Sequence, residues 1–283
     1  MKIQYHLTAN DFLSHAGGAL ARDEGRYGLI LGIARRLVAN PHWYGQDDPW
    51  FCSVQDKGRV CAVATRTPPY KVLLAYFSGD LFSVASSLSE AVAGKWAVIP
   101  GVTGDKELAD SFQKLWCRKR GVTVQKTMAE RIYRLEKVNP VPLAKGRLRP
   151  ATEADKELVV EWAHAFYLDT FGTDRNMPES DITPALAGGA VFIWEDERPV
   201  SMALKTRPTD KGIAVGGVYT PPELRRKGYA TSCVAELSRH ILQSGYRFCT
   251  LFADLANPTS NSIYKKIGYK EVCDSVDYMF EMP

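Results

Sequence analysis

The fold is decided by one stretch, Gly216-Gly217-Val218-Tyr219-Thr220-Pro221-Pro222-Glu223-Leu224-Arg225-Arg226-Lys227-Gly228-Tyr229-Ala230-Thr231. It passes from an apolar strand through a short turn into a run with helical character. The first turn of a helix has unpaired N–H groups and the positive end of the dipole, and both favour an anion. Gly228 and Ala230 leave room for an anion beside the backbone, and three cations stand next to them. The alternative is a solvated basic turn that only begins a helix.

A second stretch has the same strand-to-helix character. The run Asn257-Pro258-Thr259-Ser260-Asn261-Ser262-Ile263-Tyr264-Lys265-Lys266-Ile267-Gly268-Tyr269 follows the apolar strand Cys249-Thr250-Leu251-Phe252-Ala253. The loop Arg225-x-x-Gly228-x-Ala230 and this second stretch together resemble two motifs of the GCN5-related N-acetyltransferases. The first motif is the acyl-CoA loop Arg/Gln-x-x-Gly-x-Gly/Ala. The second is a helix that contains an Asn and a Tyr and ends at Gly-Phe/Tyr. The resemblance covers residues 147–283.

The resemblance implies an α/β fold with a mixed sheet, built as two tandem acyl-CoA N-acyltransferase halves. It implies acetyl-CoA, or another acyl-CoA, as co-substrate, no metal, and a primary amine on a small molecule or peptide as acceptor. By this resemblance Tyr264 protonates the leaving thiolate. The residues expected to hold the co-substrate are Val218, Tyr219, Thr220, Arg225, Arg226, Lys227, Gly228, Tyr229, Ala230, Thr231, Asn257 and Asn261.

Several of these positions also have a purely structural interpretation. Gly216-Gly217 predicts a β-bulge that frees backbone groups of Val218 and Thr220, but paired glycines also permit tight packing. Tyr264 could be a core side chain, and Asn257 could belong only to the start of the following helix.

The general base is not evident in the sequence. The strand Ile213–Tyr219 has no carboxylate, although the family often places a Glu there. Asp254, at the end of the next strand, is the nearest replacement and our second catalytic candidate. The alternative for Asp254 is a cap on the turn that follows it.

Secondary structure in residues 147–283 follows the acetyltransferase order β-α-α-β-β-β-α-β-α-β. The apolar periodicity and the Gly, Pro and Asp signals predict these elements. The predicted strands are Arg147–Pro150, Val191–Glu195, Val200–Thr206, Ile213–Tyr219, Phe248–Ala253 and a last group in Glu271–Glu281. The predicted helices are Glu153–Phe166, capped by Thr152 and Asp155, then Thr183–Ala187, Tyr229–Ser244 and Thr259–Lys266.

The N-terminal half looks like a degenerate copy of the C-terminal half. Residues 54–68 align with residues 194–208 at an offset of 140, as hairpins with Asp in the turn and Pro at the exit. Helices are expected in 8–21, 27–39, 80–93 and 106–119, and strands in 96–99 and 122–137. Ser78-Gly79-Asp80-Leu81-Phe82 replaces the basic loop, so this half should bind no pyrophosphate.

We therefore predict two domains. The first, residues 1–138, is a degenerate acetyltransferase-like domain without the phosphate loop, and the second, residues 147–283, is the acetyltransferase domain. Residues 136–145, which include Pro140 and Pro142, are the predicted linker.

Composition sets broad limits on function. The chain has 283 residues, 45% hydrophobic and 24% charged, as in ordinary globular proteins. Its net charge of +4 divides into +7 over residues 1–146 and −3 over residues 147–283. The six cysteines are scattered and form no C-x-x-C pair, which favours reduced thiols. The sequence shows no apolar run of membrane-spanning length and no secretory signal, so we expect a cytoplasmic protein. Disulfides or zinc are the alternative.

Two functional alternatives remain open. One is a non-catalytic acyl-CoA sensor or scaffold, favoured by the missing strand carboxylate. The other is nucleic-acid binding by the basic N-terminal half, suggested by Arg118-Lys119-Arg120, which we instead interpret as cations that complement a helix C-terminus. No membrane partner is expected, nucleic acid is disfavoured, and the sequence does not determine the oligomeric state.

Overall fold

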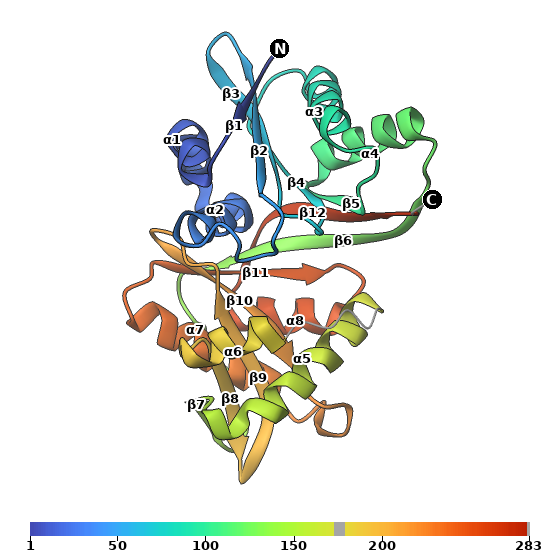
Figure 1. The fold of residues 1–283 in the computed structure, drawn as a ribbon. Helices are drawn as coiled ribbons and strands as arrows, with labels where there is room; N and C mark the ends of the chain where they lie inside the picture. The colour runs from blue at the N-terminus through green and yellow to red at the C-terminus, as the bar shows by residue number, and fades with distance from the viewer. Residues whose placement is uncertain (173–178, 282–283) are drawn as a thin grey trace. The chain divides into compact units, whose positions relative to one another are not determined.

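The structure is a computed structural model that describes residues 1–172 and 179–281. Packing divides the chain into two compact units. Unit 1 comprises residues Met1–Ile132, Ala253–Pro258 and Glu271–Pro283, and unit 2 comprises Tyr133–Phe252 and Thr259–Lys270. Each unit is a mixed α/β layer structure (Figure 1).

The two halves of the sequence repeat one order of elements, β-α-α-β-β-β-α-β-α-β, in the part of the chain that the structure describes. The first half contains β1 (Lys2–His6), α1 (Ala9–Leu20), α2 (Glu24–Ala39), β2 (Trp50–Asp56), β3 (Arg59–Arg66), β4 (Val72–Tyr76), α3 (Leu81–Lys95), β5 (Gly101–Asp105), α4 (Lys106–Arg120) and β6 (Val124–Leu135). The second contains β7 (Arg147–Pro150), α5 (Lys156–Phe171), α6 (Glu179–Ala187), β8 (Val191–Asp196), β9 (Arg198–Thr206), β10 (Gly212–Tyr219), α7 (Tyr229–Gln243), β11 (Phe248–Asp254), α8 (Pro258–Ile267) and β12 (Lys270–Phe280). The predicted duplication is confirmed at the level of fold.

Unit 1 has strands in the order β1-β2-β3-β4-β5-β12-β6, with β4 and β5 parallel. Helices α1 and α2 cover one face, where Phe12, Leu20 and Leu31 pack on Phe51 and Val63. Helices α3 and α4 cover the other face, and Figure 1 shows the two helix pairs on opposite sides of these strands. Both faces of the sheet are therefore buried, as the near-continuous apolar runs of β3 and β4 require.

The last strand of the sequence belongs to the sheet of unit 1. β12 pairs antiparallel with β5 from Ser275 opposite Asp105 to Met279 opposite Gly101. The Ser275 hydroxyl donates to the Gly104 carbonyl over 2.9 Å, and the Tyr278 hydroxyl donates to Asp110 over 2.8 Å. The packing units therefore differ from the two halves of the sequence, while the proposed boundaries 1–138 and 147–283 stay a prediction about the sequence.

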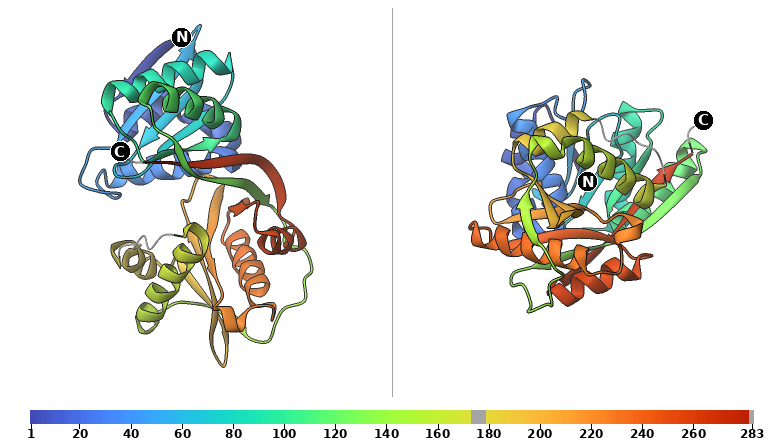
Figure 2. Two further views of the ribbon diagram at one scale, coloured as in Figure 1. Left: turned by 90° about the vertical axis from the view of Figure 1, so that its right-hand side faces the viewer. Right: turned by 90° about the horizontal axis from the view of Figure 1, so that it is seen from below.

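Unit 2 has strands in the order β11-β10-β9-β8-β7, with β10 and β11 parallel and the others antiparallel. Helices α5 and α6 pack Trp162 and Ile182 on one face, against Ile193 and Met202. Figure 2 shows α7 on the opposite side of these strands from α5. The helix that carries the predicted anion site, α7, is thus held against a sheet that is covered on both faces.

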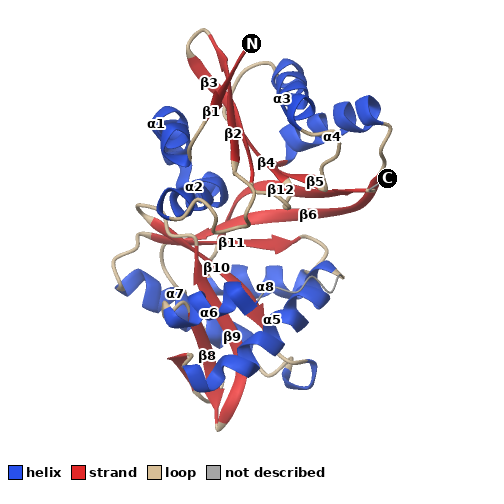
Figure 3. Cartoon of the chain, in the orientation of Figure 1, coloured by secondary structure: helices blue, strands red, loops and turns tan. Residues whose placement is uncertain are grey.

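The predicted elements of the second half are confirmed, with shifted ends (Figure 3). Thr152 and Asp155 form the predicted capping box, in which the Thr152 N–H donates to Asp155 over 2.8 Å, and the helical run extends to Phe171. The helix predicted at Thr183 begins at Glu179, and the last group of strands is the single strand β12.

The strand predicted at residues 96–99 is wrong. Those residues form no strand, and the strand β5 begins after Pro100 instead. Trp96 is used for packing, with its ring against Trp50 and the Arg66 guanidinium 4.4 Å from its ring centroid. β5 contains two glycines because its backbone lies against neighbours, and a Cβ on Gly104 would meet the Leu74 carbonyl at 2.0 Å.

The predicted linker, residues 136–145, belongs to unit 2 and packs on its helices. The Asn139 backbone N–H donates to the Ile267 carbonyl over 2.8 Å, and its side-chain amide donates to the Lys266 carbonyl over 3.2 Å. The Ala144 N–H donates to the Ser232 hydroxyl over 2.7 Å. This segment therefore caps the end of α8 and contacts the first turn of α7.

One cation of the basic run Arg118-Lys119-Arg120, at the end of α4, has a structural role. Arg120 donates to the carbonyls of Ala93 and Trp96 over 2.7 and 2.9 Å, and Gly121 ends the helix in the left-handed conformation. This agrees with the interpretation of the basic run as cations that complement the C-terminus of a helix.

Candidate functional site

The predicted β-bulge is present in β10. Its pairing with β9 shifts register between Gly216 and Tyr219, and Gly217 has φ +57°. Tight packing is present as well, because a Cβ on Gly217 would lie 2.8 Å from a Leu204 methyl carbon. Both interpretations of the glycine pair therefore hold, and the register shift leaves Val218 outside the ladder with β9.

The parallel strands β10 and β11 pair only over a short length. Their register joins Gly212 to Phe248 and ends at Ala214 opposite Thr250, and no further pair joins the two strands among the described residues. The bulge lies just beyond this last pair. β10 thus presents backbone groups that its parallel neighbour does not use.

Side chains fix the backbone after the bulge. The Ser201 hydroxyl donates to the Tyr219 carbonyl and lies 2.9 Å from the Thr220 hydroxyl. Arg225 Nε donates to the Thr220 carbonyl over 2.9 Å. One lone pair of the Thr220 carbonyl is therefore already bound, and side chains of two other segments hold the end of the strand.

The basic loop forms an uncapped helix N-terminus. After a short 3₁₀ turn at Pro222–Leu224, Arg226 and Gly228 adopt the left-handed conformation with φ +66° and +83°. Gly228 is the N-cap of α7 and has no side chain to bond the first-turn amides. The Ser232 N–H makes the first helical bond, to the Gly228 carbonyl. The amides of the three residues between them point out of the helix, where an anion can accept their hydrogen bonds.

The three cations of the loop differ in their surroundings. Arg225 donates to Asp169 over 2.5 Å as well as to the Thr220 carbonyl, so its guanidinium is held by the protein. Arg226 and Lys227 are exposed, and no described residue pairs with either. The free positive charge at this helix end therefore comes from the latter two residues.

Neighbouring elements anchor the loop. The Tyr229 hydroxyl, on the first residue of α7, donates to Asp196 over 2.7 Å. The Ser232 hydroxyl donates to the Gly228 carbonyl and accepts from the Ala144 N–H. Both contacts fix the direction in which the first-turn amides point.

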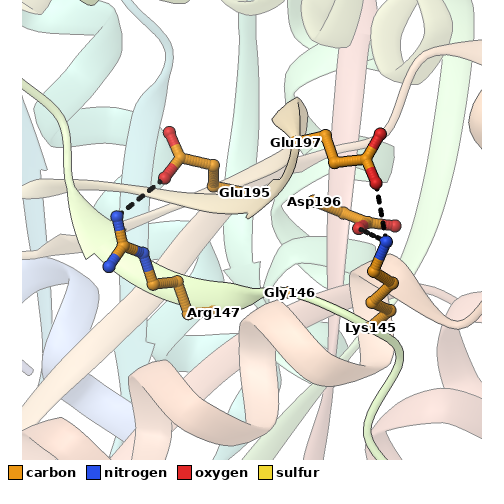
Figure 4. Close-up of a pocket in the computed structure, with 6 residues that line it drawn as sticks. All are labelled: Lys145, Gly146, Arg147, Glu195, Asp196 and Glu197. Atoms are coloured by element: carbon orange, nitrogen blue, oxygen red, sulfur yellow. Dashed lines mark hydrogen bonds and ion pairs between the residues drawn. The ribbon is translucent and has the colours of Figure 1, made fainter.

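A cavity of about 280 Å³ lies beside this anchor (Figure 4). It is lined by Lys145, Gly146, Arg147, Glu195, Asp196 and Glu197. Its charges pair with one another: Lys145 contacts Glu197 at 2.7 Å and Asp196 at 3.7 Å, and Arg147 contacts Glu195 at 3.2 Å. These ion pairs hold the β8–β9 turn, whose Asp196 orients Tyr229, and leave the cavity without a free charged group.

Tyr264 lies on α8 and is 8% exposed. Its ring packs between Tyr133 and Tyr269, at centroid distances of 6.4 and 5.9 Å. Burial raises the pKa of its hydroxyl to about 12, so the group keeps its proton at neutral pH. No described residue hydrogen-bonds to this hydroxyl. One turn earlier, Asn261 accepts a hydrogen bond of 2.7 Å from the Tyr133 hydroxyl.

Asp254 and Asn257 belong to unit 1 and form a turn after β11. The Asp254 carboxylate accepts from the Ala256 N–H over 2.8 Å, and the Asn257 N–H donates to the Asp254 carbonyl over 3.1 Å. The structure thus shows the turn-capping role that the sequence offered for Asp254. Its catalytic role, and the binding role of Asn257, stay predictions.

Unit 1 has different chemistry at the corresponding helix. The N-cap of α3 is Asp80, whose carboxylate accepts the Ser83 N–H over 2.9 Å. Hydrogen bonds from the Ser83 side chain and from the Ser83 backbone N–H lower the pKa of Asp80, so the carboxylate is charged at neutral pH. A negative side chain therefore takes the position that Gly228 leaves open in α7.

The split between the parallel strands of unit 1 is also filled. β4 and β5 pair from Val72 to Leu74, and just beyond, buried Asp105 accepts from the Tyr76 N–H and from Arg26, each over 2.7 Å. The Tyr27 hydroxyl donates to the Tyr76 carbonyl over 2.7 Å. Side chains thus bind both backbone groups of Tyr76.

Two further observations concern metals and membranes. Within residues 1–172 and 179–281, no cluster of three or more His, Cys, Asp or Glu could hold a metal ion. None of the helices described is both long and apolar enough to cross a membrane.

Residues 197–278 match the family model described as FR47-like protein. No curated protein matches the chain. Among solved structures, a Drosophila protein superposes with a TM-score of 0.71 at 14% identity, covering 98% of each chain. A GCN5-related N-acetyltransferase from Sphaerobacter thermophilus superposes with a TM-score of 0.63 at 14% identity, covering 100% of this chain and 96% of that one.

A tandem structure also matches. The tandem GNAT protein from the clavulanic acid biosynthesis pathway gives a TM-score of 0.54 at 13% identity, covering 99% of this chain and 98% of that one. At such identities the likeness concerns the fold, and it extends over both halves of the chain. The chain therefore has the tandem fold of the GCN5-related N-acetyltransferases, and its second half contains an FR47-like segment.

Proposed function

We propose that this protein is an acyl-CoA-dependent N-acyltransferase that moves acetyl from acetyl-CoA to a primary amine. The observation that carries the proposal is the continuous segment from the bulge at Gly216-Gly217 to the uncapped start of α7 at Gly228. A bulged strand supplies backbone groups for an extended amide chain, and an uncapped helix end supplies donors for a pyrophosphate.

The residues present fit the co-substrate. A Cβ at Gly228 would add bulk beside the first-turn amides, and a side-chain oxygen there would occupy the anion position, as Asp80 does in α3. Exposed Arg226 and Lys227 add charge that suits phosphate. Val218 and Thr220 are proposed to hold the pantetheine amides, and the amides of Tyr229, Ala230 and Thr231 the pyrophosphate.

The chemistry requires orientation and one proton donor. A neutral amine attacks the thioester carbonyl, and the departing thiolate takes a proton. We assign the proton to Tyr264, because burial keeps its hydroxyl protonated and no described residue uses that hydroxyl. Asp254 is retained as a candidate for the base that receives the proton of the amine.

We also propose that only the second half binds acyl-CoA. Asp80 places a negative charge at the α3 N-terminus, where a phosphate would be repelled. Asp105 and Tyr27 bind the two backbone groups of Tyr76, which a pantetheine arm would otherwise need. The role of the first half is then structural, and it includes the pairing of strand β5 with β12.

A non-catalytic acyl-CoA-binding protein is the second candidate. The observation that favours it is the lack of a carboxylate in Gly212–Tyr219 of β10. Such a protein would bind CoA at the same loop but would release no thiol in an amine-dependent way.

The test is acetyl-CoA turnover with thiol detection against a panel of primary amines. Amine-dependent thiol release, with a KM for acetyl-CoA that rises in Arg226→Ala/Lys227→Ala, supports the enzyme. CoA binding by calorimetry without thiol release from any amine supports the sensor. Absence of CoA binding overturns both.

A further inference from the structure

Strand β6, the last strand of the first half, ends inside unit 2. The boundary between the packing units falls between Ile132 and Tyr133, so residues 133–135 of β6 belong to unit 2. Tyr133 and Leu135 are 1% and 0% exposed, as expected for alternate residues of a strand that face a core. Between them, the Arg134 guanidinium lies 4.1 Å from the centroid of the Phe248 ring. The end of the first half is therefore built into the packing of the second.

The Tyr133 side chain contacts two residues of α8. Its hydroxyl donates to Asn261 Oδ1 over 2.7 Å, and its ring centroid lies 6.4 Å from the ring centroid of Tyr264. Asn261 and Tyr264 are three positions apart on α8, so they share one face of the helix. The Tyr133 hydroxyl bonds to no other described residue. A buried phenol with this single hydrogen bond restrains the side chain that accepts it.

The direction of this hydrogen bond orients the Asn261 amide. A side-chain amide has an oxygen that only accepts and a nitrogen that only donates, and rotation about its last bond exchanges the two. With the oxygen bound by the Tyr133 hydroxyl, the nitrogen is directed away from Tyr133. The pantetheine arm of CoA contains two amide groups, whose carbonyl oxygens need donors. Asn261 in this orientation is suited to supply one.

We propose that Tyr133 is a positioning residue for acyl-CoA binding, which holds Asn261 so that its side-chain N–H donates to a carbonyl of the pantetheine arm. This inference rests on the proposed function and deepens it, because it gives the first half a side chain that acts on the site of the second. A packing role would require only the ring of Tyr133. The positioning role requires its hydroxyl, and the two roles can therefore be separated.

Calorimetry on the full chain with two ligands tests the inference. One ligand is CoA, and the other is 3′-phosphoadenosine 5′-diphosphate, which keeps the pyrophosphate of CoA and lacks the pantetheine arm. Tyr133→Phe should weaken CoA binding by about two- to tenfold, the range of one hydrogen bond, and leave the nucleotide affinity within about twofold. In turnover assays the KM for acetyl-CoA should rise by the same factor, while kcat stays within about twofold because the ring beside Tyr264 remains.

Variants of Asn261 show whether Tyr133 acts through it. Asn261→Asp keeps an oxygen for the Tyr133 hydroxyl but loses the donor, so it should weaken CoA binding at least as much as Tyr133→Phe. Tyr133→Phe/Asn261→Ala should bind CoA within about twofold of Asn261→Ala alone. Tyr278→Phe is the matched control, because it removes a hydroxyl that donates to Asp110 over 2.8 Å in unit 1, and it should leave both affinities unchanged.

Unchanged CoA affinity in Tyr133→Phe overturns the inference. Equal weakening of both ligands overturns it as well, and so do additive effects of Tyr133→Phe and Asn261→Ala. If Tyr133→Phe does not fold, as thermal unfolding would show, Asn261→Asp decides: wild-type CoA affinity overturns the inference, and weakened CoA binding with unchanged nucleotide binding supports it. Absence of CoA binding by the wild-type protein instead contradicts the proposed function itself.

Discussion

Individual residues of the basic loop have different tasks although the sequence makes them look alike. Arg225 is bound to Asp169 and to the Thr220 carbonyl, whereas Arg226 and Lys227 extend into solvent. The sequence identified the run of cations, because composition and position are local properties. It could not separate Arg225 from its neighbours, because Asp169 lies 56 positions away on α5.

We expect Arg226→Ala/Lys227→Ala to weaken CoA binding and Arg225→Ala to lower stability. Charge-assisted hydrogen bonds contribute about 1.5–3 kcal/mol, and solvent exposure reduces this, so the double variant should lose about tenfold in affinity. Arg225→Ala leaves Asp169 without its partner and should lower the melting temperature by about 2–4 °C. Calorimetry and thermal unfolding of both variants measure the two effects. If Arg225→Ala and the double variant lost CoA affinity equally, Arg225 would also face the phosphates.

Tyr264→Phe should lower kcat and leave acetyl-CoA binding within about twofold. The ring still packs between Tyr133 and Tyr269, but the proton donor is lost. General acid catalysis contributes about 10²–10⁴-fold, and a thiolate is a good leaving group, so we expect the lower end. With a pKa raised to about 12, the wild-type hydroxyl stays protonated below that pH, so it should cause no alkaline loss of kcat up to about pH 11. Full kcat in the variant would assign the proton to another group.

At the scale of elements, the proposed difference in anion binding between the halves depends on the first turn of one helix in each half. α3 begins with the carboxylate of Asp80, and α7 begins with Gly228, which has no side chain. The sequence predicted that residues 78–82 lack the basic loop, because its cations and glycine are local signals, but it did not identify the Asp80 carboxylate as the N-cap. It did not predict β5, because the two glycines of that strand are required by the close approach of other backbone segments, the Tyr278 carbonyl at Gly101 and the Leu74 carbonyl at Gly104. Ser201, Ser232 and Asp196 were likewise missed, since each acts from a different element on the loop or the strand end.

Gly228→Asp should abolish CoA binding, and Gly228→Asn serves as its neutral control. Both residues tolerate the left-handed conformation better than other side chains, and both have the same shape. A Cβ at this position meets only Ala144, at 3.8 Å, so both variants should fold. We expect the Asp variant to bind at least about tenfold more weakly than the Asn variant, because its charge faces the pyrophosphate. Equal affinities, measured by calorimetry, would mean that the anion lies elsewhere.

The capping box at the start of α5 should give unit 2 an acid-sensitive stability. Arg149 binds both oxygens of Asp155 at 2.8 and 2.9 Å, and this lowers the pKa of Asp155 to about 2. Because the pKa is lower in the folded state, the stabilisation is complete above about pH 5 and is lost as the pH falls through 2. Asp155→Asn should cost about 2 kcal/mol at pH 7 and about half of that at pH 3. Urea unfolding at the two pH values measures this, and a pH-independent difference would contradict it.

At the scale of the whole molecule, the chain repeats one fold, and of the helices α3 and α7 only α7 begins without a side-chain cap. The order of elements was predictable, because the hairpins at residues 54–68 and 194–208 share turn and exit signals. The pairing of β12 with β5 was not, because strand pairing partners are set by packing and leave no local signal. The contribution of the first half is therefore visible only in the structure, where Asp105 and Asp80 take the positions that a ligand would need.

The stoichiometry of CoA binding tests the central claim most directly. Calorimetric titration of CoA into the whole protein should give one site per chain, and Gly228→Asp should remove it. Asp80→Ala, which alters the equivalent helix start of the first half, should leave the affinity of that site unchanged. Two equivalent sites per chain, or one site that survives Gly228→Asp and is lost in Asp80→Ala, would contradict the assignment of acyl-CoA binding to the second half.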